Sequence, residues 1–140
     1  MAQESGKRDF KNYTSEIMGE NVNSPEHHDI VPVVSDDNAL LYFGRRLHPD
    51  NERGVKDRID IWWLKRDGED WGTDLHHMES KLNNNGYNFI SSNFGGSWTS
   101  ILLGARIFDD ITKSGFSTSD YDGEFWSKPE KQNVENWYNN

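Results

Sequence analysis

The stretch RDGEDWG (66–72) returns later in the chain as YDGEFWS (121–127), so the motif Asp-Gly-Glu-x-Trp occurs twice. Asp-Gly is the strongest short signal for a tight hairpin turn, because glycine takes the positive φ of such a turn without steric cost. The Trp of each motif would then lie on the strand that leaves the turn. A motif that recurs in this way predicts a fold made of repeated units.

Short, dense apolar runs surround the two motifs. They are IVPVV (30–34), ALLYF (39–43), IWWL (61–64), FI (89–90) and ILLGA (101–105). Such runs are too short for buried helices, and their β-branched and aromatic content favours strands. Turn clusters such as SDDN (35–38) and GGS (95–97) separate them. The sequence therefore predicts an all-β chain of meandering antiparallel strands.

The apolar runs do not alternate with polar residues, as strands do when one face of their sheet meets water. We therefore expect sheets that are covered on both faces. A parallel α/β sheet would need crossover helices, and no segment between the runs has a helical period. Sheets that stack on like sheets remain, which is the arrangement of propellers and solenoids.

Two segments of the chain follow one order of features: an Asn, a short strand, a turn, an apolar strand that ends in Arg, a loop, a strand and the Asp-Gly-Glu-x-Trp motif. This unit matches a propeller blade, a four-stranded antiparallel meander. We expect a polar leading segment (1–21), a first blade (22–80), a second blade (81–133) and the truncated start of a third repeat (134–140). The predicted fold is a partial β-propeller of about two blades.

The first unit also resembles a known family. DIVPVVSDD followed by LLYF (29–43), DIWW (60–63) and RDG with its Trp (66–71) are similar to the repeat of TolB-type β-propellers, which also occurs in bacterial envelope proteins with an OmpA-type domain. The second unit departs from this pattern where SNFGG (92–96) replaces the Ser-Asp-Asp-Asn turn. The resemblance implies a scaffold that presents loops to an envelope protein or glycan, in the periplasm or cell envelope, without catalysis.

Composition narrows the classes of partner. The formal net charge is −9, whereas nucleic acid and anionic membrane surfaces are bound through clustered Lys and Arg. No apolar run is long enough for a membrane span or a signal peptide, and no Cys is present for disulfides or thiolate chemistry. We expect no nucleic-acid partner, no membrane insertion and no cofactor.

Charged residues beside the apolar strands are the candidates for partner contact. Arg45, Arg46 and Arg106 follow the apolar strand in the two units, where a salt bridge within the scaffold competes with binding of a carboxylate partner. Together with His28 and Asp29 they form the predicted partner-binding rim. The Trp of each repeated motif is expected to pack between blades rather than to stack on a sugar or peptide.

Two histidine pairs, HH (27–28) and HH (76–77), are poorly placed to chelate one ion, because adjacent residues of a strand point to opposite faces. We expect both pairs in solvated loops. Asp36 and Asp37 follow Ser35 in a turn, where their side chains are expected to bond their own backbone.

A second function is open, that of a carbohydrate-active propeller, either a lectin or a glycoside hydrolase. Asp57, Asp60, Asp109 and Asp110 could furnish a pair of catalytic carboxylates if two of them lie roughly 5–10 Å apart. Two blades would also leave two apolar faces bare. We expect further blades from a longer chain or from copies of this one to cover them, unless the sheets close as a small barrel.

Overall fold

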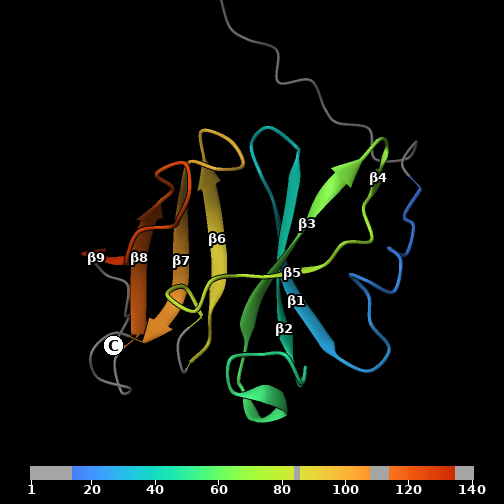
Figure 1. The fold of residues 1–140 in the computed structure, drawn as a ribbon, viewed down its shortest axis with the longest axis horizontal. Helices are drawn as coiled ribbons and strands as arrows, with labels where there is room; N and C mark the ends of the chain where they lie inside the picture. Colours follow the sequence, from blue (N-terminus) through green and yellow to red (C-terminus); the bar gives the residue numbers. More distant parts are fainter. Residues whose placement is uncertain (1–13, 84–85, 108–113, 135–140) are drawn as a thin grey trace, which may run out of the picture.

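The structure is a computed structural model that describes residues 14–83, 86–107 and 114–134, without the side chains of 105–107 and 114. In these parts of the chain the strands form two antiparallel sheets that lie side by side (Figure 1). The first sheet contains β1 (His28–Val34), β2 (Leu40–Arg46), β3 (Asp60–Asp67), β4 (Asp70–Trp71) and β5 (His76–His77), the last paired with β3. The second contains β6 (Phe89–Phe94), β7 (Ser100–Ile107), β8 (Ser114–Asp120) and β9 (Glu130–Gln132). The expectation of an all-β chain is confirmed.

Gly44 in β2 and Gly104 in β7 mark the same position in the two sheets. Gly44 pairs with Ile30 and Gly104 with Phe89, and a β-bulge follows at the same place in β1 and β6. A Cβ on Gly104 would lie 2.5 Å from a ring carbon of Phe89, and one on Gly44 would lie 2.7 Å from a methyl carbon of Ile59. Only glycine leaves room for the side chain of Ile59 over Gly44 and for that of Phe89 over Gly104.

The repeated Asp-Gly-Glu-x-Trp motif closes an outer hairpin in both sheets. In each motif the Trp pairs with the residue that precedes the Asp, so Trp71 faces Arg66 and Trp126 faces Tyr121. The motif glycines have φ values of 63° and 108°, as the turn prediction requires. Trp126 is buried between the sheets with 1% exposure, whereas Trp71 packs half-buried on the outer side of the first sheet.

Alternate side chains of β2 enter two different hydrophobic clusters. Leu40 and Tyr42 join the core between the sheets, and Leu41 and Phe43 join a cluster on the far face of the first sheet, which Val22, ahead of β1, helps to cover. This confirms that the first sheet is covered on both faces. It also explains why its apolar run shows no polar alternation.

The two sheets pack front to back. The face of the first sheet that carries Leu40 and Tyr42 meets the face of the second that carries Ile101 and Leu103. Counted from the matching glycines, those two residues occupy the positions of the far-face residues of β2.

Polar contacts between two turns fasten the sheets at the upper end in Figure 1. The Asp37 carboxylate accepts hydrogen bonds from the Ser97 N–H (3.0 Å) and hydroxyl (2.6 Å). Asp36 accepts from the Gly95 N–H (3.0 Å), and its own N–H donates to the Asn93 side-chain oxygen (3.1 Å). We call these contacts the inter-sheet tie. The aspartates were expected to bond their own turn, and this expectation missed their contacts with the second sheet.

Candidate partner-binding face

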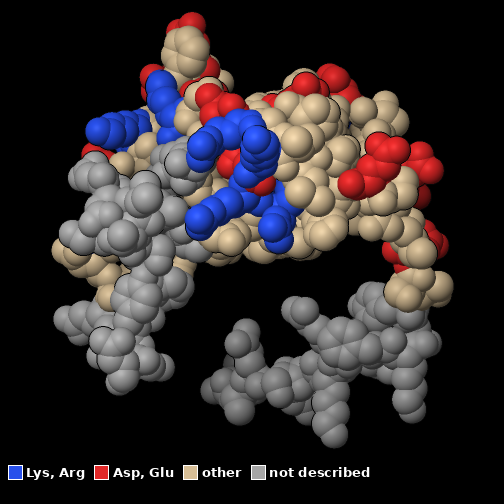
Figure 2. All heavy atoms as spheres, turned by 90° about the horizontal axis from the view of Figure 1, so that it is seen from below, with Lys and Arg blue, Asp and Glu red and all other residues tan. Residues whose placement is uncertain are grey.

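The loop between β2 and β3 contains a short 3-10 helix, η2 (Gly54–Lys56), and forms the lower end of the first sheet in Figure 1. Arg53, Lys56 and Arg58 are exposed in this loop, and Arg46 precedes it at the end of β2. Lys and Arg side chains gather on the face seen from this end (Figure 2). We call these four residues the basic face. Its charge is opposite to the net charge of −9.

Arg46 is the member of the basic face with an unsatisfied group. Its Nε atom is buried and has no hydrogen-bond partner among the described residues. Leaving a buried donor unpaired costs about 1–3 kcal/mol, and more when the group is charged. The planar guanidinium is suited to bind a carboxylate through two parallel hydrogen bonds. The Nε of Arg46 is thus a donor that neither the described residues nor solvent satisfies.

Arg45, the neighbour of Arg46, points to the opposite face of the sheet and is 3% exposed. Its Nε lies 2.5 Å from Asp29 Oδ1, and its Nη2 donates to Asp29 Oδ2 (3.1 Å) and to the Asn21 carbonyl (2.8 Å). This ion pair joins the leading segment, β1 and β2. The side chains of Arg45 and Asp29 therefore bind each other inside the protein, and neither is presented to a partner at the predicted rim.

The remaining residues of the predicted rim lie at strand ends. His28 is exposed at the start of β1 and pairs with Arg46, so these two stay together at the lower end of the first sheet. The backbone of Arg106 pairs with Gly115 near the end of β7, and its side chain lies outside the described residues.

Two buried carboxylates support the loop from inside. Asp57 accepts hydrogen bonds from the N–H groups of Arg53 (2.9 Å) and Arg58 (2.8 Å), and Asp60 accepts from the Glu52 N–H (2.6 Å). Burial, and then repulsion from Asp60, raises the pKa of Asp57. Asp57 and Asp60 thus lie inside the loop, while its basic side chains face solvent together with the acidic Asp50 and Glu52.

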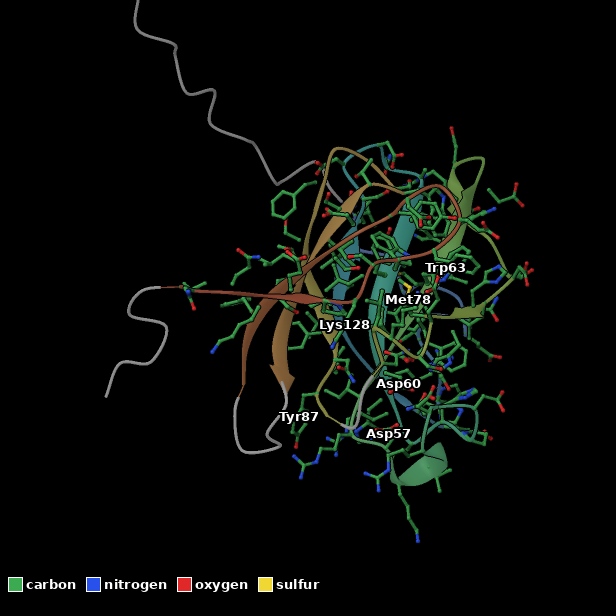
Figure 3. All side chains as sticks on the ribbon, turned by 60° about the vertical axis from the view of Figure 1, so that its left-hand side comes forward. Asp57, Asp60, Trp63, Met78, Tyr87 and Lys128 are labelled. Atoms are coloured by element: carbon green, nitrogen blue, oxygen red, sulfur yellow. The ribbon has the colours of Figure 1, made fainter. Side chains whose placement is uncertain are left out.

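These carboxylates do not form the open pair that a glycosidase needs. Asp57 is 4% exposed and Asp60 is fully buried, just above Asp57 and Tyr87 in Figure 3. Both carboxylates also accept hydrogen bonds from backbone N–H groups, so their oxygens serve the loop rather than an open site. Asp109 and Asp110, the other two candidates, lie outside the described residues.

A row of rings lies on the far face of the first sheet. His27 and His48 are 4.5 Å apart between ring centroids, His48 and Trp62 4.6 Å, and Trp62 and His77 4.7 Å. His77 Nε2 lies 2.7 Å from Asp60 Oδ2. Burial, followed by the nearby His27 and Arg45, lowers the pKa of His48.

The expectation that both histidine pairs lie in solvated loops is wrong for the second pair and for His28, which begins β1. His76 and His77 form β5, which pairs with β3. His76 stacks on Trp63 (4.1 Å, 12°), while His77 contacts Trp62 on the other face. The two imidazoles do point to opposite faces, as predicted, and cannot share an ion.

The sequence interpretation missed the loop that supplies most of the basic face. The signal was present as RGVKDR (53–58), which carries three basic residues around an exposed Val in an acidic chain. It also missed Asn51, whose side chain accepts from Trp62 Nε1 (2.9 Å) and donates to the Arg45 carbonyl (2.9 Å), tying the loop to both strands.

Comparison with protein-family models, curated proteins and solved structures finds no match for the chain. Within the described ranges, no group of three or more His, Cys, Asp and Glu side chains could hold a metal ion. No helix of the described part is long and apolar enough to cross a membrane.

Proposed function

We propose that the chain is a non-enzymatic interaction module, built as about two blades of a TolB-like β-propeller, that binds a protein or glycan of the bacterial cell envelope. The front-to-back packing of two sheets with matching bulges and matching Trp hairpins is the observation that carries this proposal. Blades of a propeller repeat one meander and stack in the same sense. The basic face would be the surface that meets the partner.

The contacts of the chemically reactive side chains support binding rather than catalysis. Asp57, Asp60 and His77 are engaged in hydrogen bonds that hold the scaffold. The Nε of Arg46 is buried without an acceptor among the described residues, and an unsatisfied guanidinium group favours a role in binding a partner.

The completion of the scaffold belongs to the same proposal. The outward face of the second sheet carries half-buried Leu102, Phe116 and Thr118. Further blades from a longer chain, or copies of this one, would cover this face.

Retention on bacterial envelope extracts tests the proposal. Immobilised wild type should retain a component that Arg46→Ala loses. Lys65→Ala removes the same charge from an exposed position near the upper turn and should retain it. If wild type retains nothing, or if both variants lose the component equally, the basic face is not the binding surface.

A carbohydrate-active protein is the second candidate, favoured by a row of aromatic rings at the margin of the inter-sheet core. Trp63 and Trp98 lie 5.0 Å apart, and Trp98 and Tyr121 lie 5.2 Å apart. All three are half-buried, so each has ring surface for a sugar. A glycan array and a glycosidase panel, both without signal, would remove this candidate.

A further inference from the structure

We propose that the partner of the basic face is a protein segment that combines acidic and apolar side chains, and that Arg46 anchors one of its carboxylates. This inference rests on the proposed function and specifies the chemistry of its partner. It follows from the charge of the face, from the unsatisfied Arg46 and from the apolar side chains between the basic ones.

The charge of the face selects an acidic partner. Arg53, Lys56 and Arg58 are exposed within one short loop, and the Lys and Arg side chains form a coherent group in Figure 2. The four basic residues of this face outnumber its exposed Asp50 and Glu52 and attract an acidic partner, although the chain as a whole carries −9. The orientation of the complex is thereby fixed by electrostatics.

Arg46 supplies the anchor. Its guanidinium is half-buried, and a partner carboxylate would meet the fork through the terminal nitrogens, because Nε itself is covered. Exposed His28 lies opposite Arg46 across the strand pair, so its imidazole supplies a further hydrogen-bonding group on this side.

Apolar side chains are interleaved with the basic ones. Leu47 directly follows Arg46 and is 42% exposed, and Val55, in the centre of η2, is 55% exposed. Leu47 is held at a φ of 61°, a conformation that bulky residues avoid. A strained, exposed Leu beside an unpaired Arg is typical of a surface shaped for a partner.

The same surface fits a peptide better than a glycan. Sugars bind to open aromatic faces, and Tyr87 is the large aromatic residue at this end, 40% exposed (Figure 3). Arg58 lies over its ring at 5.2 Å from the centroid. With that ring face occupied, the exposed apolar surface that remains is aliphatic and matches Leu-like side chains.

Fluorescence anisotropy with defined peptides tests the inference. The probe is a labelled peptide of Glu and Leu residues spaced by Gly; two matched peptides carry Gln for Glu or Ser for Leu. Wild type should bind the Glu/Leu peptide, bind both matched peptides more weakly, and lose affinity with added salt. Arg46→Ala should weaken binding by about tenfold or more, the effect of losing one charged hydrogen-bond partner.

Control variants separate binding from folding. Lys65→Ala should bind like wild type, and Arg46→Lys, which keeps the charge but not the fork, should fall between wild type and Arg46→Ala. Thermal melts verify that each variant is folded; if Arg46→Ala is not, Arg46→Lys and Arg58→Ala carry the test.

Two results would overturn the inference: no binding of the Glu/Leu peptide by folded wild type, or binding of an oligogalacturonate in its place. If the peptide fails while an envelope component is still retained through Arg46, the proposed function stands and only the partner chemistry is wrong. If neither is retained, both proposals fall.

Discussion

Asp37 shows how a single carboxylate can join two sheets. It receives hydrogen bonds from the hydroxyl of Ser35 in its own turn and from Ser97 across the interface. These bonds, from Ser35 first and then Ser97, hold the pKa of Asp37 well below its usual range. The charged form of Asp37 is therefore part of the folded structure.

Replacement of this carboxylate should make the protein less stable and less sensitive to acid. Because the native pKa of Asp37 is lowered, its contribution to stability is complete above the unfolded-state pKa of about 3.9 and is lost as pH falls below that value. Asp37→Asn should lower the melting temperature at pH 7 and flatten its decline between pH 5 and pH 3.

Circular dichroism melts across this pH range measure the effect, with Asp70→Asn as the control at an exposed position of β4. Asp57 acts in the opposite direction, since its raised pKa favours the folded state as pH falls. Asp57 is present in both proteins, so the difference in melting temperature between wild type and Asp37→Asn reports the contribution of Asp37 alone. Equal pH profiles would show that Asp37 does not stabilise the interface.

The pairing of Phe89 with Gly104 is a requirement of the β6–β7 element. A methyl group on Gly104 would also lie 2.5 Å from the Ser91 hydroxyl. Gly104→Ala should therefore destabilise the protein by about 1–3 kcal/mol through overpacking. Urea unfolding measures this loss, and Phe89→Ala in the same chain should restore part of it. Gly19→Ala, where no atom lies within 4 Å of the added methyl group, should be close to neutral.

The two motif tryptophans should contribute differently to stability, although they occupy the same position in the Asp-Gly-Glu-x-Trp motif. Trp126→Ala removes a side chain buried between the sheets and should cost about 3–5 kcal/mol. Trp71→Ala should cost less, because Trp71 is half-buried on the outer side. Urea unfolding of both variants provides the comparison. A larger loss for Trp71 would mean that the outer cluster, rather than the inter-sheet core, dominates stability.

Short-range signals in the sequence predicted the elements well. Glycine in Asp-Gly-Glu-x-Trp fixed the turns, and the apolar runs located β2, β3 and β7. The sequence does not predict which of Arg45 and Arg46 is buried. Strand periodicity places neighbouring residues on opposite faces, but it does not say which face is inside. That choice depends on which face of the first sheet meets the second sheet.

At the scale of the whole molecule, one core serves both sheets, since its buried side chains come from β2 and β3 as well as from β6 and β7. We therefore expect a single cooperative unfolding transition, with far-UV and near-UV signals that coincide. Two separate transitions would contradict a shared core. Light scattering on the same sample reports whether copies of the 16.3 kDa chain associate through the outward sheet faces.

The contacts that hold the whole together were the least predictable. Asp36 and Asp37 meet partners 57 to 60 residues further along the chain, in a turn whose sequence departs from the repeat. His77 reaches Asp60 only because β5 returns along β3. Such pairings depend on the packing of distant segments, and no local pattern encodes them.

The inter-sheet tie is not repeated on the second sheet. Units that stack front to back form a closed ring when the rotation between them closes and an open filament when it does not. Counted from the paired strands, Gly95 and Gly96 occupy the positions of Asp36 and Asp37 in the second unit. The outward face of the second sheet thus lacks the anchor that joined it to the first. A further unit that covers this face would therefore be held by contacts other than the inter-sheet tie.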